Sequence, residues 1–191
     1  MKKITLVCFT FILVMMSALA FAVPCLDDVG YYNNHGTLID EDRLPRVTLH
    51  TKGMATREGP ATEYVDRGRY VPPAKKVEAI SYATDSNGFI WVQVEFITSL
   101  GAPRRLYAGH NAFEKFALSK IPMERYMGVC FTASKDIESY TGPGYHYVPH
   151  DMPISSGKEL NCITQENNFY MVEYWVKGQI YRAWIPTSEI Q

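Results

Sequence analysis

The sequence predicts an all-β protein of two small barrels in tandem, placed after a cleaved signal peptide. First, the patterned segments are rich in Val, Ile, Thr, Phe and Trp, and the chain of 191 residues has 13 tyrosines. These residue types favour strands, and long stretches of apolar spacing with the helical period of 3.6 are missing. Second, the same blocks of sequence occur twice in the same order. Third, an apolar leader precedes both copies.

Residues 1–22 have the pattern of a secretory signal peptide. Two lysines are followed by an apolar run up to Met16, and the small residues Ala20 and Ala22 stand where a signal peptidase cleaves. We expect cleavage between Ala22 and Val23. The mature chain is then secreted or held in the cell envelope, outside the cytoplasm, with no membrane contact after cleavage.

Two alternatives for the leader are weaker. The uncharged stretch from Ile4 to Pro24 has about the 20 residues that a membrane anchor needs. A lipoprotein acylated at Cys25 would need a small residue just ahead of the cysteine, and Val23 and Pro24 do not provide it. The cleavage site therefore favours export over both alternatives.

Composition and repeats divide the chain into five parts. The predicted parts are a signal peptide (1–22), an acidic lead-in (23–46), a first barrel (47–113), a linker (114–127) and a second barrel (128–191). Where the first barrel passes into the linker, Ala112–Leu118 is expected to form a short helical turn that Pro122 ends.

The internal repeat is carried by four matched blocks. Gly59–Val65 recurs as Gly142–Val148 at an offset of 83 residues. The other matched blocks are Val77–Ser81 with Leu160–Thr164, Trp91–Phe96 with Phe169–Tyr174, and Arg105–Gly109 with Arg182–Pro186, at offsets of 83, 78 and 77. The offset shrinks in small steps at loops, as deletions in a duplicated module would make it do.

Each repeat is predicted to contain short strands joined by tight turns. Glycine in the Gly-Pro pairs is expected to supply unusual dihedral angles at the first turn. Asn87-Gly88 and Asn167-Asn168 are hairpin-turn dipeptides. Strand alternation predicts an inward face made of Val92, Val94 and Phe96, and of Tyr170, Val172 and Tyr174. The outward face is then made of Trp91, Gln93 and Glu95, and of Phe169, Met171 and Glu173.

These blocks resemble the bacterial SH3-like (SH3b) family. The opening Ala55–Pro60, the strand that begins at Trp91 and the closing Arg182–Pro186 are similar to the opening, the tryptophan-led strand and the final strand of that family. The tandem arrangement resembles proteins exported by Gram-positive bacteria of the Clostridia type. Repeat two departs from the family at Glu138–Thr141, where the arginine of the opening would be.

The resemblance implies a binding protein of the envelope. Small barrels of this kind bind extended peptides or wall polymers along an aromatic groove, which suits rigid rings that carry a polar handle. The candidate binding residues are Tyr64, Trp91, Tyr107, Tyr145, Tyr147, Phe169 and Trp184. The expected partner is a peptidoglycan peptide or an envelope protein. For the four rings that recur between repeats, core packing is the favoured alternative, and Trp91 is the better ligand candidate.

A second hypothesis assigns the barrels a structural role, in which they pack on each other or on a protein partner without a small ligand. The residues give little support to other classes of function. Nineteen Lys and Arg residues against 20 Asp and Glu residues do not favour nucleic acid as a partner. His146 and His150 are four apart, but Pro149 argues against a helix that would join them at a metal. We therefore predict a protein that is not an enzyme and has no metal or other cofactor.

The cysteines predict one disulfide, between Cys130 and Cys162. An offset of 83 places them on Val47 and Ala79, so repeat one lacks both cysteines and repeat two has both. Exported chains meet conditions in which disulfides persist. The two strands are expected to be neighbours, which leaves Cys25 unpaired. Two buried free thiols are the alternative.

Overall fold

The structure is a computed structural model, and the residues it describes are 46–49, 54–66, 70–71, 76–114 and 117–190. The predicted signal peptide (1–22) and the acidic lead-in up to residue 45 lie outside the described residues, so they stay predictions. We call residues 46–114 the first module, residues 117–128 the joining segment and residues 129–190 the second module.

The first module contains a five-stranded antiparallel sheet in the order β6-β5-β4-β1-β7, and a ribbon of two strands, β2 and β3. Its elements are β1 (Arg46–Leu49), β2 (Met54–Ala55), β3 (Tyr70–Val71), β4 (Lys76–Thr84), β5 (Ile90–Ile97), β6 (Pro103–Gly109), the 3₁₀ helix η2 (His110–Ala112) and β7 (Phe113–Glu114).

The second module repeats this order with a four-stranded antiparallel sheet, β11-β10-β9-β8. Its elements are β8 (Val129–Thr132), β9 (Glu159–Glu166), β10 (Phe169–Val176), β11 (Gln179–Pro186) and the 3₁₀ helix η4 (Thr187–Glu189). The all-β prediction is confirmed. The barrels are not confirmed, because among the described strands the first and last strands of each sheet do not pair and no closed barrel forms.

The predicted hairpin turns occur where the dipeptides are. Asn167 and Asn168 both have positive φ, 49° and 61°, and join β9 to β10. Two consecutive positive φ values define the turn that matches the twist of paired strands. Between β4 and β5, Gly88 has φ of 80° and its N–H donates to the carbonyl of Asp85 at 3.0 Å.

The predicted inward residues form the cores. Val92, Val94 and Phe96 pack in the first module with residues of β4 and β6, and Val92 and Val94 are fully buried. In the second module, Val172 and Tyr174 are buried in the core and Tyr170 packs against it. Alternation along β5 and β10 therefore gives the correct core face.

The opposite face of both strands is also buried, which the prediction missed. The residues expected to face outward, each no more than 8 % exposed, are Trp91, Gln93, Glu95, Phe169, Met171 and Glu173. Several of them meet side chains of the other module, as Gln93 does with Met171 and Glu95 with Tyr147. The second face of each sheet is thus a contact surface between modules.

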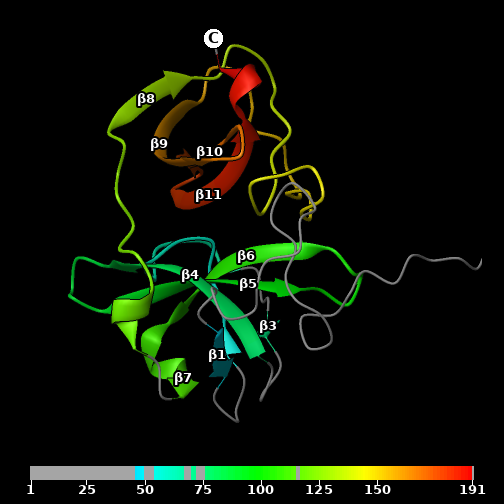
Figure 1. Cartoon of the computed structure of the whole chain (residues 1–191). Helices are drawn as coiled ribbons and strands as arrows, with labels where there is room; N and C mark the ends of the chain where they lie inside the picture. Colours follow the sequence, from blue (N-terminus) through cyan, green and yellow to red (C-terminus); the bar gives the residue numbers. More distant parts are fainter. Residues whose placement is uncertain (1–45, 50–53, 67–69, 72–75, 115–116, 191) are drawn as a thin grey trace, which may run out of the picture.

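The joining segment forms less helix than predicted. Between Ala112 and Leu118, residues Phe113 and Glu114 form β7, and the ring of Phe113 is buried in the core. The 3₁₀ helix η3 (Leu118–Lys120) follows, and the chain then rises along one side of the molecule to β8 (Figure 1). Burial of the Phe113 ring stabilises an extended strand beside β1. The helical turn predicted for Ala112–Leu118 is therefore replaced at Phe113 and Glu114 by a strand.

Figure 1 shows the two modules stacked, with the second module above the first and the sheet of β4, β5 and β6 below β10 and β11. Within the described ranges, no helix has the length and apolar character of a membrane span.

Candidate functional site

The contact between the modules contains a first buried cluster around Arg182, which we call the Arg182 cluster. The Nε of Arg182 donates to Glu173 at 3.1 Å and its Nη1 donates to Glu124 at 2.8 Å. The hydroxyl of Tyr64, from the first module, donates to the same Glu173. A guanidinium from β11 thus holds carboxylates from β10 and the joining segment.

A second cluster forms around Arg105, and we call it the Arg105 cluster. Its Nε donates to Glu95 at 2.5 Å, and its two Nη atoms donate to Glu166 at 2.7 and 3.1 Å. The hydroxyl of Tyr147, from the second module, donates to Glu95 at 2.6 Å. Here a guanidinium from β6 holds carboxylates from β5 and β9.

The two clusters are related by the internal repeat. Their corresponding members are Tyr64 and Tyr147, Glu95 and Glu173, and Arg105 and Arg182, at the offsets of 83, 78 and 77. Each tyrosine reaches across to the glutamate of the opposite module. A surface that contacts its own equivalent in this way is isologous, which is the arrangement of a two-fold dimer. The modules therefore pack as a pseudo-two-fold pair within one chain.

The ring contacts of the arginines and the backbone hydrogen bonds between the modules also occur in pairs related by the internal repeat. The ring contacts, from guanidinium carbon to ring centre, are Arg105 with Tyr147 and Trp184, both at 5.6 Å, and Arg182 with Tyr64 and Tyr107, at 5.1 and 5.4 Å. The backbone hydrogen bonds are Val65 N to Ile180 O, at 3.2 Å, and Val148 N to Pro103 O, at 3.1 Å. Gln93 Nε2 lies 3.6 Å from Sδ of its equivalent, Met171, so the two residues mark the pseudo-two-fold axis.

The electrostatics of both clusters favour charged arginines and neutral tyrosines. Burial by itself lowers the pKa of Arg105, but Glu95 and Glu166 outweigh burial and raise that pKa well above its ordinary value. Burial raises the pKa of Tyr107 well above its ordinary value, and Glu124 raises it further. Because the phenols keep their protons, they donate hydrogen bonds to the carboxylates. The clusters are therefore cross-links between modules, in which polar groups bond to one another.

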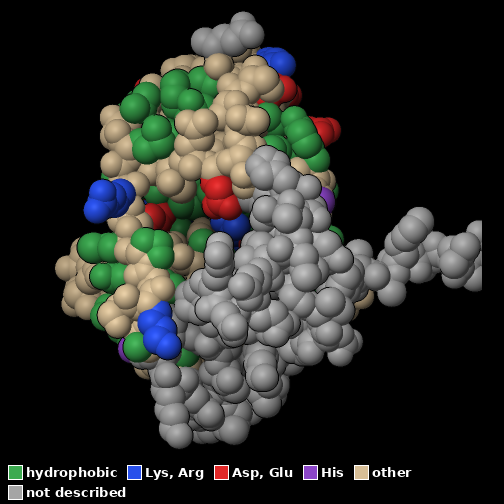
Figure 2. All heavy atoms as spheres, in the orientation of Figure 1, with side chains coloured by type: hydrophobic (Ala, Val, Ile, Leu, Met, Phe, Trp, Pro, Cys, Tyr) green, Lys and Arg blue, Asp and Glu red, His purple; other side chains and the backbone are tan. Residues whose placement is uncertain are grey.

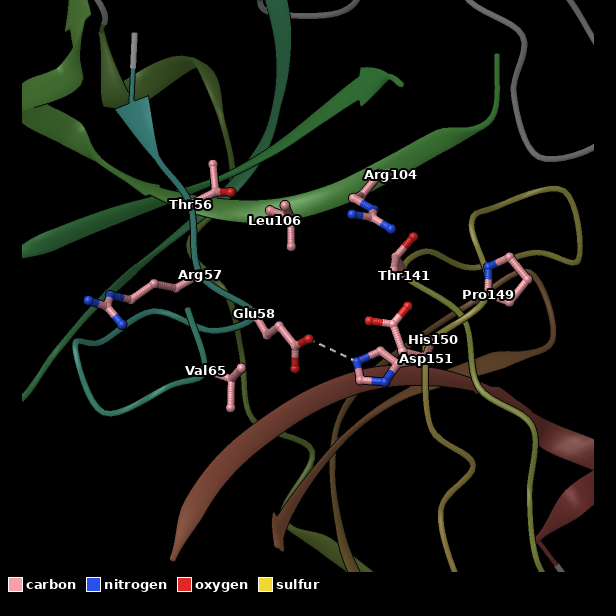
Figure 3. Close-up of a pocket in the computed structure, with 10 residues that line it drawn as sticks. All are labelled: Thr56, Arg57, Glu58, Val65, Arg104, Leu106, Thr141, Pro149, His150 and Asp151. Atoms are coloured by element: carbon pink, nitrogen blue, oxygen red, sulfur yellow. Dashed lines mark ion pairs between the residues drawn. The ribbon is translucent and has the colours of Figure 1, made fainter. Parts of the chain in front are cut away.

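A small pocket lies at one edge of this contact (Figure 3). Glu58 and His150 point toward one another across it, and His150 Nε2 lies 3.0 Å from Glu58 Oε1. The lining residues are Thr56, Arg57, Glu58, Val65, Arg104, Leu106, Thr141, Pro149, His150 and Asp151. The cavity has a volume of about 10 Å³, and a neighbouring one has about 20 Å³. Each has room for roughly one water molecule and none for a peptide or sugar.

Figure 2 shows the surface at this level: acidic and basic side chains lie close together between the upper and lower parts of the molecule. Of the glutamates that bond to the two arginines, the side chain of Glu166 is 37 % exposed and that of Glu124 is 7 % exposed.

The structure buries six of the seven aromatic candidates for ligand binding. The buried rings, none more than 8 % exposed, are Tyr64, Trp91, Tyr107, Tyr147, Phe169 and Trp184. The four that recur between repeats are buried as favoured, but all four contact the arginines between the modules. Tyr145 is the exposed one, at 68 %.

Trp91, the preferred ligand candidate, is covered by its own hairpin. Its ring lies edge-on to Phe89 with centres 5.5 Å apart, and its Nε1 donates to Asp85 Oδ2 at 3.2 Å. The indole is 7 % exposed, so in this structure the ring lies on the face opposite to the core residues of β5 and packs against a loop. The β4–β5 turn supplies both covering residues.

Tyr145 forms the outer member of a three-ring group, which we call the Tyr145 platform. Its ring packs edge-on against Phe169 at 5.0 Å and Tyr140 at 5.5 Å, measured between ring centres. Beside it, His146 packs on Tyr147 at 4.6 Å, and burial lowers the pKa of this histidine. The supporting rings are buried, so the platform offers one face of Tyr145 on a rigid base.

The predicted disulfide does not form, since Cys130 and Cys162 are both free in the structure. Their strands, β8 and β9, are neighbours as expected, but Cys130 pairs with Asn161 and Cys162 pairs with Val129. A shift of one residue places side chains on opposite faces of a sheet. Accordingly Cys130 is exposed, whereas Cys162 is 1 % exposed with its Sγ 3.6 Å from Met127 Sδ.

The register error comes from the repeat alignment. In the first module Val47 pairs with Val77, and in the second module Phe131 pairs with Leu160. Val47 therefore corresponds to Phe131, an offset of 84 instead of 83. Between the paired residues of β8 and β9 the second module has one residue fewer than the first module has between β1 and β4, and this difference turns Cys130 away from Cys162.

The histidines do not assemble a metal site in the described part of the chain, where no group of three or more His, Cys, Asp or Glu residues could hold an ion. His150 contacts the carboxylate of Glu58, and His146 is exposed beside Tyr147.

Sequence reasoning missed the charged residues between the modules. Glu95 and Glu173 occupy matched positions on the strand face opposite the core, and so do Arg105 and Arg182 on the next strand. Each glutamate pairs directly with the arginine of its own module across the two strands. A charge pair repeated at the same place in both copies is the signal that could have indicated a contact surface.

Comparisons with known proteins give little similarity. No protein-family model matches the chain, and no curated protein matches it. One solved structure, NlpC2 from Trichomonas vaginalis, aligns with 14 % sequence identity and a TM-score of 0.28. The alignment covers 78 % of this chain, which spans 48 % of the length of that protein. A TM-score this low supports no inference about fold or function.

Proposed function

We propose that the protein is an exported, non-catalytic binding protein with two SH3b modules, which recognises a cell-wall peptide or another extended polymer through the Tyr145 platform. The observation that carries this proposal is the exposure of Tyr145, 68 %, on a base of buried rings. A tyrosine ring held in this way offers a large rigid face and a polar hydroxyl at small cost in entropy.

The modules support an SH3-like assignment through their common order of strands. In each, an antiparallel meander of three strands lies beside an earlier strand, and a 3₁₀ helix follows the last strand of the meander. The repeat of this order of four strands in two halves of one chain accords with duplication of one module.

The contact between modules favours a binding role over a catalytic one. Its arginines, glutamates and tyrosines bond to one another, and its cavities hold about one water molecule. These groups stabilise the orientation of the modules, so the Tyr145 platform stands on a fixed support. Export follows from the pattern of residues 1–22, and it would bring the platform to the wall.

Among the described residues, the positions of the first module that correspond to the platform do not form one. At the repeat offset of 83, Tyr145 corresponds to Thr62, and Tyr140 corresponds to Arg57. The position of Phe169 is taken by Trp91, which the β4–β5 turn covers. We therefore assign ligand binding to the second module and support of that module to the first.

A sedimentation assay with purified peptidoglycan tests the proposal. Tyr145→Ala should weaken binding at least tenfold, which corresponds to about 1.4 kcal/mol, because the exposed stacking face is lost. Trp175→Ala is the matched control, since Trp175 is also an exposed aromatic of the second module, at 54 %, but has no part in the platform.

The control variant should bind as the unchanged protein does. Equal binding by the Tyr145 variant, with both variants folded, contradicts the assignment of the platform. If the unchanged protein does not bind peptidoglycan, the second candidate applies: a structural module of the envelope that contacts proteins and has no small ligand. The closed contact between modules is the observation that favours that candidate.

A further inference from the structure

Strand β8 lies at the end of the sheet of the second module. It pairs with β9, and among the described residues no strand lies along its other edge. In the first module the corresponding strand, β1, has neighbours on both sides, because β4 and β7 both pair with it. Leu49 pairs there with Phe113, and Thr48 with Glu114, in antiparallel register. The repeat therefore shows what fits this position: an antiparallel extended segment.

The free edge of β8 lacks the features that normally prevent pairing. Alternate backbone N–H and C=O groups of an edge strand point outward and can pair with another chain. Natural edges are protected by charged side chains, proline or a bulge. The sequence of β8 is Val129-Cys130-Phe131-Thr132, which has no charge and no proline, and its pairing with β9 runs without a bulge.

Apolar side chains are exposed at the start of β8 and along the segment that leads into it. Val129 is 41 % exposed, and the segment before it exposes Met123, Tyr126 and Met127, each at 45 % or more. This segment is held in place: Tyr126 donates to Glu173 at 3.0 Å, and the N–H of Met127 donates to the carbonyl of Ile163 at 3.0 Å. Exposed apolar surface that is held fixed indicates a contact site.

We propose that β8 pairs antiparallel with β8 of a second copy of the protein, joining two four-stranded sheets into one of eight strands. A strand that meets its own copy across a two-fold axis must run antiparallel to it. This is the orientation that β7 has beside β1. The second copy supplies an extended, uncharged strand of matching length, and pairing over the full strand places Val129 of each copy opposite Thr132 of the other. The pairing uses neither the Tyr145 platform nor the contact between modules.

The test measures the mass of the mature chain over a range of concentrations, by light scattering and by analytical ultracentrifugation. The chain carries Cys25→Ser, so that among the described thiols Cys130 is exposed and Cys162 is buried. We expect a dimer that dissociates on dilution. A bismaleimide cross-linker of about 10 Å should join the two Cys130 residues, because strand neighbours within a register step or two lie within that distance.

Two variants at one position separate edge pairing from other association. Cys130→Lys places a charge on the edge and should raise the dimer dissociation constant at least tenfold. Cys130→Ser should keep the dimer and lose the cross-link. Trp175→Lys, at an exposed residue of β10, and Tyr145→Ala should leave the dimer unchanged. Thermal unfolding of each variant confirms that it is folded.

A chain that stays monomeric at every concentration overturns the proposal. So does a dimer that Cys130→Lys leaves intact, or a cross-link that maps to other residues. A protein that binds peptidoglycan but forms no dimer contradicts only the pairing of β8. A protein that forms the dimer but does not bind peptidoglycan contradicts only the role of the Tyr145 platform.

Discussion

At the scale of single residues, Gly59 and Gly142 each lie directly against a tyrosine ring. A Cβ atom added at Gly59 would lie 2.2 Å from Cδ1 of Tyr64, and one at Gly142 would lie 2.0 Å from Cδ1 of Tyr147. Neither glycine has a positive φ, so the expectation of unusual dihedral angles is wrong at these positions. Close approach of the ring selects glycine here, and it positions the tyrosines that cross between modules.

Gly142→Ala should therefore destabilise the protein by about 1–3 kcal/mol, the usual cost of overpacking a filled space. Gly144→Ala is the matched control in the same loop. Its Cβ would meet the side chain of His146 at 2.6 Å, and that exposed side chain can rotate away. Urea unfolding of both variants gives the two free energies. Equal values would contradict the steric explanation.

At the scale of elements, the joining segment is bonded to both modules. The N–H of Tyr82, on β4, donates to the carbonyl of Pro122 at 3.0 Å, and the N–H of Glu124 donates back to Tyr82 at 2.8 Å. The N–H of Met127 then donates to Ile163, on β9, at 3.0 Å. The segment thus brings the Glu124 carboxylate to Arg182 and acts as a structural part of the contact.

Glu124→Gln should lower the free energy of unfolding by about 1.5–3 kcal/mol, the range for hydrogen bonds that involve charge. Its carboxylate is 7 % exposed and accepts from both Arg182 and Tyr107. Glu166→Gln, which removes the corresponding carboxylate from Arg105, should cost less than half as much because its side chain is 37 % exposed and water can replace it. Chemical denaturation of the pair measures the difference, and a larger loss for Glu166→Gln would reverse the explanation.

At the scale of the whole molecule, tyrosines between the modules make stability depend on alkaline pH. Burial raises the pKa of Tyr64, Tyr107 and Tyr147 above the ordinary value of 10.0, and neighbouring glutamates raise it further. Above pH 10 the unfolded chain releases these phenolic protons while the folded chain keeps them. Stability is therefore complete below pH 10 and falls as pH rises above it.

We expect the free energy of unfolding to fall between pH 9 and pH 11, by up to about 1.4 kcal/mol per pH unit for each of the three tyrosines above pH 10. Tyr107→Phe should reduce the slope, by less than one third because burial also raises the pKa of Tyr126 and Tyr140. Urea unfolding at several pH values gives the slope directly. A free energy that does not change over this range would show that the phenols ionise equally in both states.

The sequence predicts local features of this structure, such as strand faces and turns, better than contacts between residues far apart in the chain. Alternation in Trp91–Phe96 correctly predicts the core face, and Asn167-Asn168 correctly predicts a hairpin, because both depend on local geometry. The burial of Gln93 and Glu95 depends on docking of a second module, and their polarity made an exposed face the simpler prediction. The position of Cys130 depended on a difference of one residue between the two modules in the segment that joins the first two strands of the sheet.

The axis between the modules has a consequence for how the two halves can diverge. In a dimer of identical modules, a residue on the two-fold axis faces its own copy, so every substitution there alters both partners together. Here an amide, Gln93, faces a thioether, Met171. The two residues can differ because the equivalent positions of the two modules are encoded separately in one gene. The same freedom permits Thr62 in one loop and Tyr145 in the other. Fusion of the halves thus allows the two modules to differ at the axis and in their loops while the contact between them is kept.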